Sequence, residues 1–185
     1  TTVVSTLRFV NDKPTWRYSP SYYQPGDRGP AGGFVFYVTD GGLHGLEAAP
    51  SDQGTEVAWG CIDDYVSGAA GVGVGDGRIN TAAILLCESV DGAAALAATS
   101  YVLNGYDDWF LSSRGELGQL HSQYVARPIY GGFANMAEYY WSSTQSSIHD
   151  QAWVRLFDGP NQFVEFEFSK DERSSSLRVR SVRSF

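Results

Sequence analysis

The residues able to carry catalytic or metal chemistry are scattered along the chain, and none falls into a recognised motif. His44, His121 and His149 have no histidine partner four positions away, and no Cys-x-x-Cys or His-Glu-x-x-His pattern supplies zinc ligands. The Gly-x-Ser-x-Gly, Walker and Gly-x-Gly-x-x-Gly motifs of common hydrolases and nucleotide-binding proteins are also missing. We therefore predict that the protein is not an enzyme and needs no cofactor or metal.

Two pairs of adjacent carboxylates, Asp63-Asp64 and Asp107-Asp108, could in principle bind calcium or act in acid–base catalysis. Calcium loops alternate their acidic positions so that several oxygens converge on one ion. Neither pair lies in such a pattern, and adjacent acids in loops are usually solvated turn residues. We therefore expect no metal at either pair.

The charge balance limits which anions the protein could bind. Thirteen Lys and Arg against 21 Asp and Glu give a formal net charge of −8, which argues against general nucleic-acid binding. The charge is uneven, because residues 155–185 hold six basic and five acidic residues, whereas residues 1–154 hold seven and sixteen. We expect any anion site to draw on the C-terminal end.

Five basic residues are candidates for an anion site. Arginine offers paired planar donors to a sulfate, and lysine offers a mobile ammonium group. Lys170 and Arg173 are the first choices, because they lie on an expected loop at residues 169–176. The second choices are Arg127, Arg155 and Arg183.

Tyrosines near the expected loops indicate a second kind of site. A tyrosine offers an apolar face and a hydroxyl at small entropic cost, which suits a sugar or protein surface. The alternative, that each tyrosine only bridges core and surface, stays open. The tyrosines considered are Tyr22, Tyr23, Tyr101, Tyr106, Tyr124, Tyr130, Tyr139 and Tyr140.

The first half of the chain predicts a strand pair followed by helices. Residues 34–38 are an apolar run that ends at the turn-forming residues 40–42, and residues 43–49 are expected to be the partner strand. The five glycines of residues 68–77 predict a surface loop. Helices are expected at residues 80–86, with Asn80 as N-cap, and at 92–100. A third should follow the capping box formed by Ser113 and Glu116.

The last third of the chain predicts short strands, which makes the expected class α+β. These strands are expected at residues 139–143, 152–157, 163–168 and 177–184. The alternation of the last two predicts a hairpin in which Glu167 faces Arg178 and Glu165 faces Arg180. A slip of the alternation near Ser181 predicts a β-bulge.

Residues 1–30 are expected to form an N-terminal arm, and residues 31–185 the ligand-binding domain. Four of the seven prolines lie in this first segment. Val3, Val4, Leu7 and Phe9 would be exposed on the arm of a monomer, so we consider them for packing against a neighbouring subunit. Packing of the arm on its own domain is the alternative.

The two cysteines, Cys61 and Cys87, bear on the cellular compartment. One disulfide in a chain rich in Gly, Ser and Tyr fits an extracellular protein, but two buried free thiols remain the alternative. The sequence has no apolar run long enough to cross a membrane and no signal-peptide pattern at Thr1. The chain is therefore expected to be an excised domain.

Several separated blocks resemble the C-terminal domain family of the Legionella collagen-like adhesin. The matching blocks are residues 26–38 (GDRGPAGGFVFYV), 41–50 (GGLHGLEAAP), 104–113 (NGYDDWFLSS), 140–143 (YWSS) and 179–185 (VRSVRSF). The resemblance implies a C-type-lectin-like α+β fold, with short antiparallel strands around two or three helices and an N-terminal arm that packs in a trimer.

The chain departs from its lectin-like relatives in ways that limit the function. Ser112 stands where relatives commonly have proline, and no Glu-Pro-Asn or Gln-Pro-Asp motif is present, which argues against calcium-dependent sugar binding. No cysteine follows Trp109, so the thiols of formylglycine-generating oxidases have no counterpart.

The family resemblance implies a function at the bacterial cell surface. We expect the extracellular head of a trimeric adhesin, carried on a collagen-like stalk, that binds sulfated glycosaminoglycans such as heparin. Such a head would support attachment to host cells, biofilm formation and virulence. The alternative is a lectin-like module that recognises a host or bacterial surface protein through its Tyr, Ser and Asn loops.

Overall fold

The computed structural model describes residues 3–10, 13–20, 22–87, 93–127, 132–133, 138–158, 165–172 and 177–185, with backbone only for 3–20. It contains helices and mostly antiparallel sheets, which confirms the expected α+β class. The helices are η1 (Asp40–Gly42), α1 (Asp76–Ile84), α2 (Ala94–Thr99) and α3 (Arg114–Ala126). Within these described ranges, no helix is long and apolar enough to cross a membrane.

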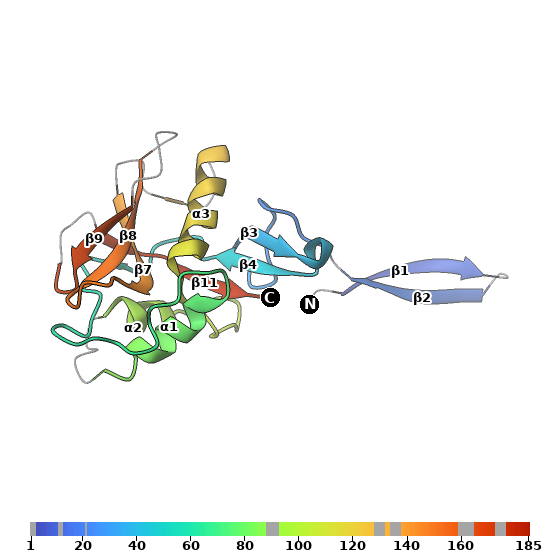
Figure 1. Cartoon of the computed structure of the whole chain (residues 1–185). Coiled ribbons are helices and arrows are strands. Elements are labelled where there is room, and N and C mark those ends of the chain that lie inside the picture. Colours follow the sequence, from blue (N-terminus) through green and yellow to red (C-terminus); the bar gives the residue numbers. More distant parts are fainter. Residues whose placement is uncertain are drawn as a thin grey trace.

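The strands form three sheets, ordered β1-β2, β3-β4-β11-β6 and β5-β10-β7-β8-β9. Figure 1 shows the third sheet at one end of the molecule and the β1-β2 hairpin at the other, with α3 on one side of the head and α1 and α2 on the opposite side. The strands are β1 (Val3–Val10), β2 (Lys13–Pro20), β3 (Phe34–Thr39), β4 (His44–Ala48), β5 (Gly54–Thr55), β6 (Phe110–Leu111), β7 (Glu138–Gln145), β8 (Gln151–Phe157), β9 (Glu165–Ser169), β10 (Leu177–Val179) and β11 (Ser181–Ser184).

The N-terminal arm is a two-stranded antiparallel hairpin that ends earlier than the sequence indicated. Its last strand, β2, stops at Pro20, and Figure 1 shows the hairpin projecting from the head. The segment after it belongs to the head, because the backbone N–H of Tyr23 donates to Gly42 O and that of Gly26 donates to Val35 O. The Tyr23 ring also lies 5.0 Å from the ring of Phe185.

The expected hairpin between β9 and β10 does not form. β9 pairs with β8, whereas β10 lies between β5 and β7 and is parallel to β7. The two side chains of β10 that point inward, Leu177 and Val179, are fully buried in the core, which holds this strand in the middle of the sheet. The carboxylates of Glu165 and Glu167 consequently have other partners than Arg180 and Arg178.

The slip of the alternation near Ser181 marks a change of sheet. The chain leaves the five-stranded sheet at Val179 and enters the four-stranded sheet at Ser181, so the expected bulge is wrong. Arg180 lies at this junction, where its guanidinium bonds the carboxylate of Asp52 and the carbonyl of Ala49. Burial of this arginine therefore joins the two sheets.

The helices begin where local hydrogen bonds direct them. α3 opens with the predicted capping box, in which Ser113 Oγ accepts from Glu116 N at 3.1 Å and Glu116 Oε2 accepts from Ser113 N at 2.8 Å. α1 begins at Asp76 after Gly75 and not at Asn80. The Asn80 side chain binds both backbone groups of Gly71 and so closes the glycine-rich loop instead of capping the helix.

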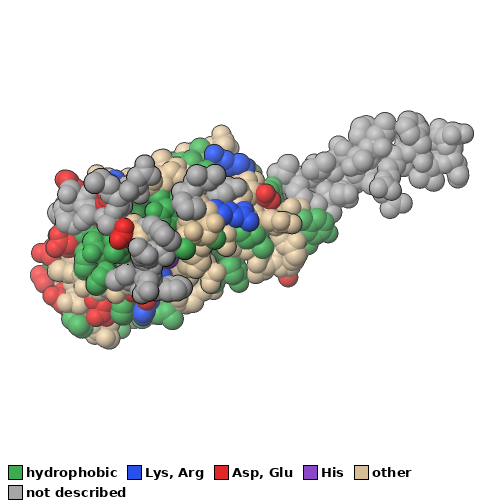
Figure 2. Space-filling view, turned by 90° about the horizontal axis from the view of Figure 1, so that it is seen from above, with side chains coloured by type: hydrophobic (Ala, Val, Ile, Leu, Met, Phe, Trp, Pro, Cys, Tyr) green, Lys and Arg blue, Asp and Glu red, His purple; other side chains and the backbone are tan. Residues whose placement is uncertain are grey.

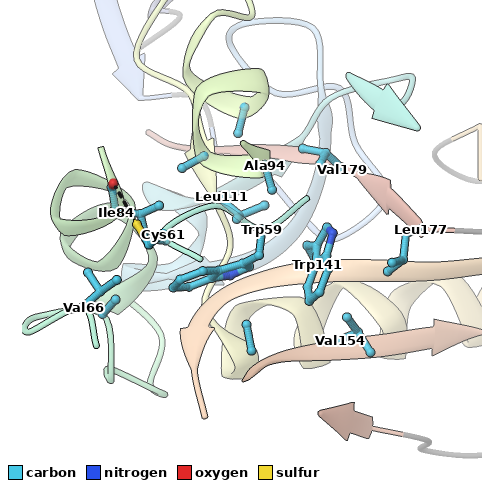
Figure 3. Close-up of a cluster of buried hydrophobic side chains, with 14 residues drawn as sticks. Trp59, Cys61, Val66, Ile84, Ala94, Leu111, Trp141, Val154, Leu177 and Val179 are labelled. Carbon is cyan, nitrogen blue, oxygen red and sulfur yellow. Dashed lines mark hydrogen bonds between the residues drawn. The ribbon is translucent and has the colours of Figure 1, made fainter. Parts of the chain in front are cut away.

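The main core lies between α1, α2 and the five-stranded sheet. Figure 3 shows the two indole rings of Trp59 and Trp141 at its centre, with aliphatic side chains around them. A disulfide joins Cys61 to Cys87, so one of the two alternatives left by the sequence is realised. A second cluster, which includes Leu117, Leu120 and Phe157, packs α3 against the sheets.

Candidate functional site

An open groove of about 400 Å³ runs beside α3, and we call it the α3 groove. Helix α3 forms one wall, strands β8 and β9 form the other, and Val72 of the glycine-rich loop closes one end. Five of its eight lining residues carry polar or charged side chains. The lining residues are Val72, Arg114, Gly115, Gly118, Gln119, Ser122, Arg155 and Glu165.

The period of α3 explains why this face is open. Gly115, Gly118 and Ser122 recur at the spacing of one helix face, so small side chains face the groove while leucines face the core. A Cβ atom on Gly118 would lie 3.1 Å from Arg155 Nη2. Glycine at this position therefore lets a guanidinium pack directly against the helix backbone.

Two arginines in the groove share one carboxylate. Arg155 on β8 and Glu165 on β9 are opposite each other in the sheet, and Arg155 Nη2 donates to Glu165 Oε1. Arg114, the first residue of α3, donates through Nε to Glu165 Oε2 at 2.7 Å. Its guanidinium also lies 3.7 Å from the centre of the Trp153 ring, which fixes its position.

This sharing leaves the groove with a surplus positive charge. Arg155 is only 6% exposed, and its Nε and Nη1 atoms have no hydrogen-bond partner among the described residues. Burial lowers the pKa of the Arg155 guanidinium, and the nearby Glu165 opposes that effect. Since one carboxylate serves two guanidiniums, an additional anion would be electrostatically favoured here.

His121 lies beneath the groove and is neutral at neutral pH. Burial, and then the charge of Arg155, lower the pKa of its imidazole to about 4. Its ring packs edge-on against Phe157 with 4.9 Å between the ring centres. A neutral imidazole beside Arg155 adds no repulsion to the buried guanidinium.

A second pair of arginines lies at the far end of α3. Arg127 is exposed at the C-cap and donates to Pro25 O at 2.5 Å, and Arg28 lies 3.9 Å from the centre of the Phe34 ring. Thirteen positions along the helix separate Arg114 from Arg127, or about 20 Å. Figure 2 shows most of the acidic side chains in that view at the end of the head far from the hairpin, with basic side chains nearer the middle.

Lys170, the first choice for an anion site, is buried and not on a surface loop. It is only 1% exposed, and Nζ donates to the carbonyl of Asp64 and to Gln145 Oε1 at 2.9 Å. The ammonium also lies 4.9 Å from the centre of the Trp59 ring, and burial lowers its pKa to about 8. The sequence-based role is therefore wrong, because these partners consume the donors of the ammonium group.

The remaining candidates divide between structural roles and the groove. Arg183 is buried and bonds Glu47 at 3.0 Å and Asp108, so it braces β11 and does not face a ligand. Arg173 lies outside the described residues. Of the five residues, Arg155 lines the groove and Arg127 is exposed at the end of α3.

The tyrosines expected at loops are less exposed than the sequence indicated. Tyr124 and Tyr140 are buried in the core, and Tyr22 is exposed. Tyr23, Tyr101, Tyr106 and Tyr139 are partly buried, and Tyr130 lies outside the described residues. Bridging of core and surface accounts for most of them.

No sequence pattern predicted the basic residues Arg114 and Arg28 at this helix, or Glu165 as the carboxylate between Arg114 and Arg155. The capping box identified Arg114 as the first helical residue, so its place at the helix N-terminus could have been found. Glu165 was assigned to a hairpin partner that the sheet order does not provide. Comparison of the whole sequence finds no matching protein-family model and no matching curated protein.

Proposed function

We propose that this chain is the head of a bacterial surface adhesin that binds a sulfated glycosaminoglycan in the α3 groove. The observation that carries the proposal is the pair Arg114 and Arg155, which share the single carboxylate of Glu165 at an open groove. In this proposal the α+β head is a C-type-lectin-like domain, and the protein is extracellular and has no catalytic role. The Cys61–Cys87 disulfide supports an oxidising compartment.

The groove has the chemistry that a sulfated sugar needs. Arg114 is partly exposed and can share its donors between Glu165 and a sulfate, and Gln119 and Ser122 offer neutral hydrogen-bond groups to sugar hydroxyls. Arg127 and Arg28 lie toward the β3 side of α3, where Arg127 lines a separate cavity with Phe34, so they are not part of the groove. The proposed ligand is a linear polyanion whose anionic groups reach Arg114 at the open groove.

The hairpin is the proposed oligomerisation segment of a homotrimer. Its register places Val3, Leu7 and Phe9 at alternate positions of β1, on one side of the ribbon, and Val4 on the other side. A two-stranded hairpin is marginally stable alone, so packing against neighbouring hairpins would stabilise it. Three heads on one polymer would raise the overall affinity by about 10²–10⁴.

The test is a titration of the purified protein with heparin at low and high salt, after its mass in solution is measured by light scattering. We expect binding by a trimer that weakens steeply with salt, because counterions are released from the polyanion. An unsulfated polysaccharide is the control ligand and should not bind. No salt-sensitive heparin binding by the intact oligomer would overturn the proposal.

A variant pair locates the site. Arg114→Ala should weaken heparin binding by about tenfold, because it removes the exposed guanidinium of the groove. Arg78→Ala is the matched control, since Arg78 is an exposed arginine on α1 away from the groove. Equal losses in the two variants would show that heparin responds to the net charge of the protein and not to the α3 groove.

A further inference from the structure

The end of the head opposite the hairpin carries a second surface, which we call the distal tip. It consists of residues 62–65, residues 147–150, Asp171 and Glu172, all of them exposed. Figure 1 shows the β7–β8 turn and the end of β9 at the end of the head that is far from the hairpin. The segments come from distant parts of the sequence.

The distal tip exposes large apolar side chains together. Tyr65 is 53% exposed, Ile148 is 47% exposed and Ile62 is 37% exposed. The ring of Tyr65 lies 6.1 Å from that of His149, centre to centre, so the two loops present their side chains side by side. Apolar side chains grouped on a soluble surface are typical of protein contact sites.

The loops beneath this surface are fixed by buried bonds. The Lys170 ammonium bonds the carbonyl of Asp64 and the amide oxygen of Gln145, and Val66 N donates to that same oxygen at 2.7 Å. Lys170 N in turn donates to Asp150 O at 2.8 Å, and the disulfide anchors Cys61. The surface is therefore formed before any partner arrives, which lowers the entropic cost of binding.

The charge at the distal tip determines which partner it suits. Five exposed carboxylates belong to it, and Lys170, which comes just before Asp171 in the sequence, is buried beneath them. A polyanion would be repelled. Among the described residues, no group of three or more His, Cys, Asp and Glu side chains could hold a metal ion. The carboxylates are Asp63, Asp64, Asp150, Asp171 and Glu172.

We propose that the distal tip is a docking surface for a basic protein segment that carries Lys or Arg next to apolar side chains. The carboxylates would pair with the basic residues, and Tyr65, Ile148 and Ile62 would cover the apolar ones. This surface is separate from the α3 groove and would bind a partner of opposite charge. The protein would then hold a polyanion and a basic protein at the same time.

The test uses a short synthetic peptide in which arginine alternates with leucine, titrated into the whole chain by calorimetry. The double variants Tyr65→Ser/Ile148→Ser and Asp63→Asn/Asp150→Asn should each weaken binding about tenfold. Asparagine suits position 63, because that residue has a positive φ of 64°. A peptide with serine in place of leucine should also bind about tenfold more weakly.

The matched controls are Ile79→Ser on α1 and Asp40→Asn in η1, which change exposed residues of the same kinds elsewhere. Both should bind the peptide within about twofold of the unmodified chain. Equal losses in tip and control variants, or equal binding of the serine peptide, would overturn the proposal. So would a change of mass in solution caused by the tip variants, since it would assign the surface to a second copy.

Discussion

The α3 groove and the distal tip are both built around a buried cation, but they present opposite charges to the solvent. In the groove, Arg155 bonds through Nη2 to Glu165, and its Nε and Nη1 atoms have no partner among the described residues. At the tip, the Lys170 ammonium donates to Asp64 O and Gln145 Oε1. The first arrangement leaves positive charge for a ligand, whereas the second leaves an acidic surface outside.

The difference shows that a basic residue in a segment expected to be a loop is not necessarily a ligand residue. A guanidinium has five N–H donors, and one shared carboxylate cannot satisfy them. An ammonium has three donors, and two oxygens and an indole ring satisfy them in the interior. The balance of charges around each cation, and not its position in the sequence, decides which region can attract an anion.

The largest expected effect is on stability, from removal of the Lys170 side chain that is buried beneath the distal tip. Lys170→Ala should lower the free energy of unfolding by about 3 kcal/mol, because it opens a cavity beside Trp59 and leaves buried acceptors unpaired. Heparin affinity of the folded fraction should stay unchanged. Urea denaturation measures the first quantity, and titration well below the unfolding midpoint measures the second.

A loss of heparin binding in folded Lys170→Ala protein would contradict the division of roles between the two cations. Asp171→Asn is the control, since it changes an exposed neighbour on the same turn. That variant should leave the free energy of unfolding within about 0.5 kcal/mol of the unmodified chain.

Removal of the disulfide should also destabilise the part of the head that carries the distal tip. Replacement of Cys61 and Cys87 by Ala removes the cross-link that restricts the unfolded chain. It should lower the free energy of unfolding by about 3 kcal/mol for a sequence separation of 26. Hydrogen exchange should then increase first in residues 61–66 and remain slow in α3. Equal loosening of α3 would show that the two regions do not unfold separately.

The elements that the sequence predicted are those fixed by local contacts. The capping box at Ser113 and Glu116 is closed by bonds three residues apart, and β3 and β4 form a strand pair across a short turn. Such signals lie within one stretch of sequence. Cys61 and Cys87 could be paired only as one of two alternatives, because a single pair has no spacing code.

The features that sequence reasoning got wrong depend on contacts between distant segments. The parallel pairing of β10 with β7 leaves no turn signal, and burial of Lys170 needs Asp64 and Gln145 to meet beneath one turn. The start of α1 was predicted wrongly, because the Asn80 side chain bonds Gly71 across a loop instead of capping the helix. In each case the contact joins segments that no local sequence pattern connects.

A pH titration separates the groove from the tip, because the His121 imidazole is buried beneath the groove and the His149 imidazole is exposed at the tip. The pKa of His121 is lowered to about 4, so the unfolded chain binds a proton between pH 6.5 and pH 4 that the folded chain does not. Stability is therefore lost as the pH falls through this range, by about 2 kcal/mol between pH 6.5 and pH 4.5. Urea midpoints across that range measure the slope.

The slope should shrink in His121→Phe, which keeps an aromatic ring against Phe157. The control His149→Gln changes an exposed imidazole at the distal tip and should keep the full slope. If His149→Gln removed the slope instead, the acid sensitivity would belong to the tip and not to the groove.

The smallest expected effect tests the shared carboxylate itself. Glu165→Gln should raise heparin affinity about fivefold, because both Arg114 and Arg155 would then lack their anion and a sulfate would meet no competing carboxylate. Glu167→Gln is the matched control, since Glu167 is two positions along the same strand and bonds Ser146 instead of an arginine. Both variants remove one negative charge, so a gain confined to position 165 would come from the release of two guanidiniums and not from net charge.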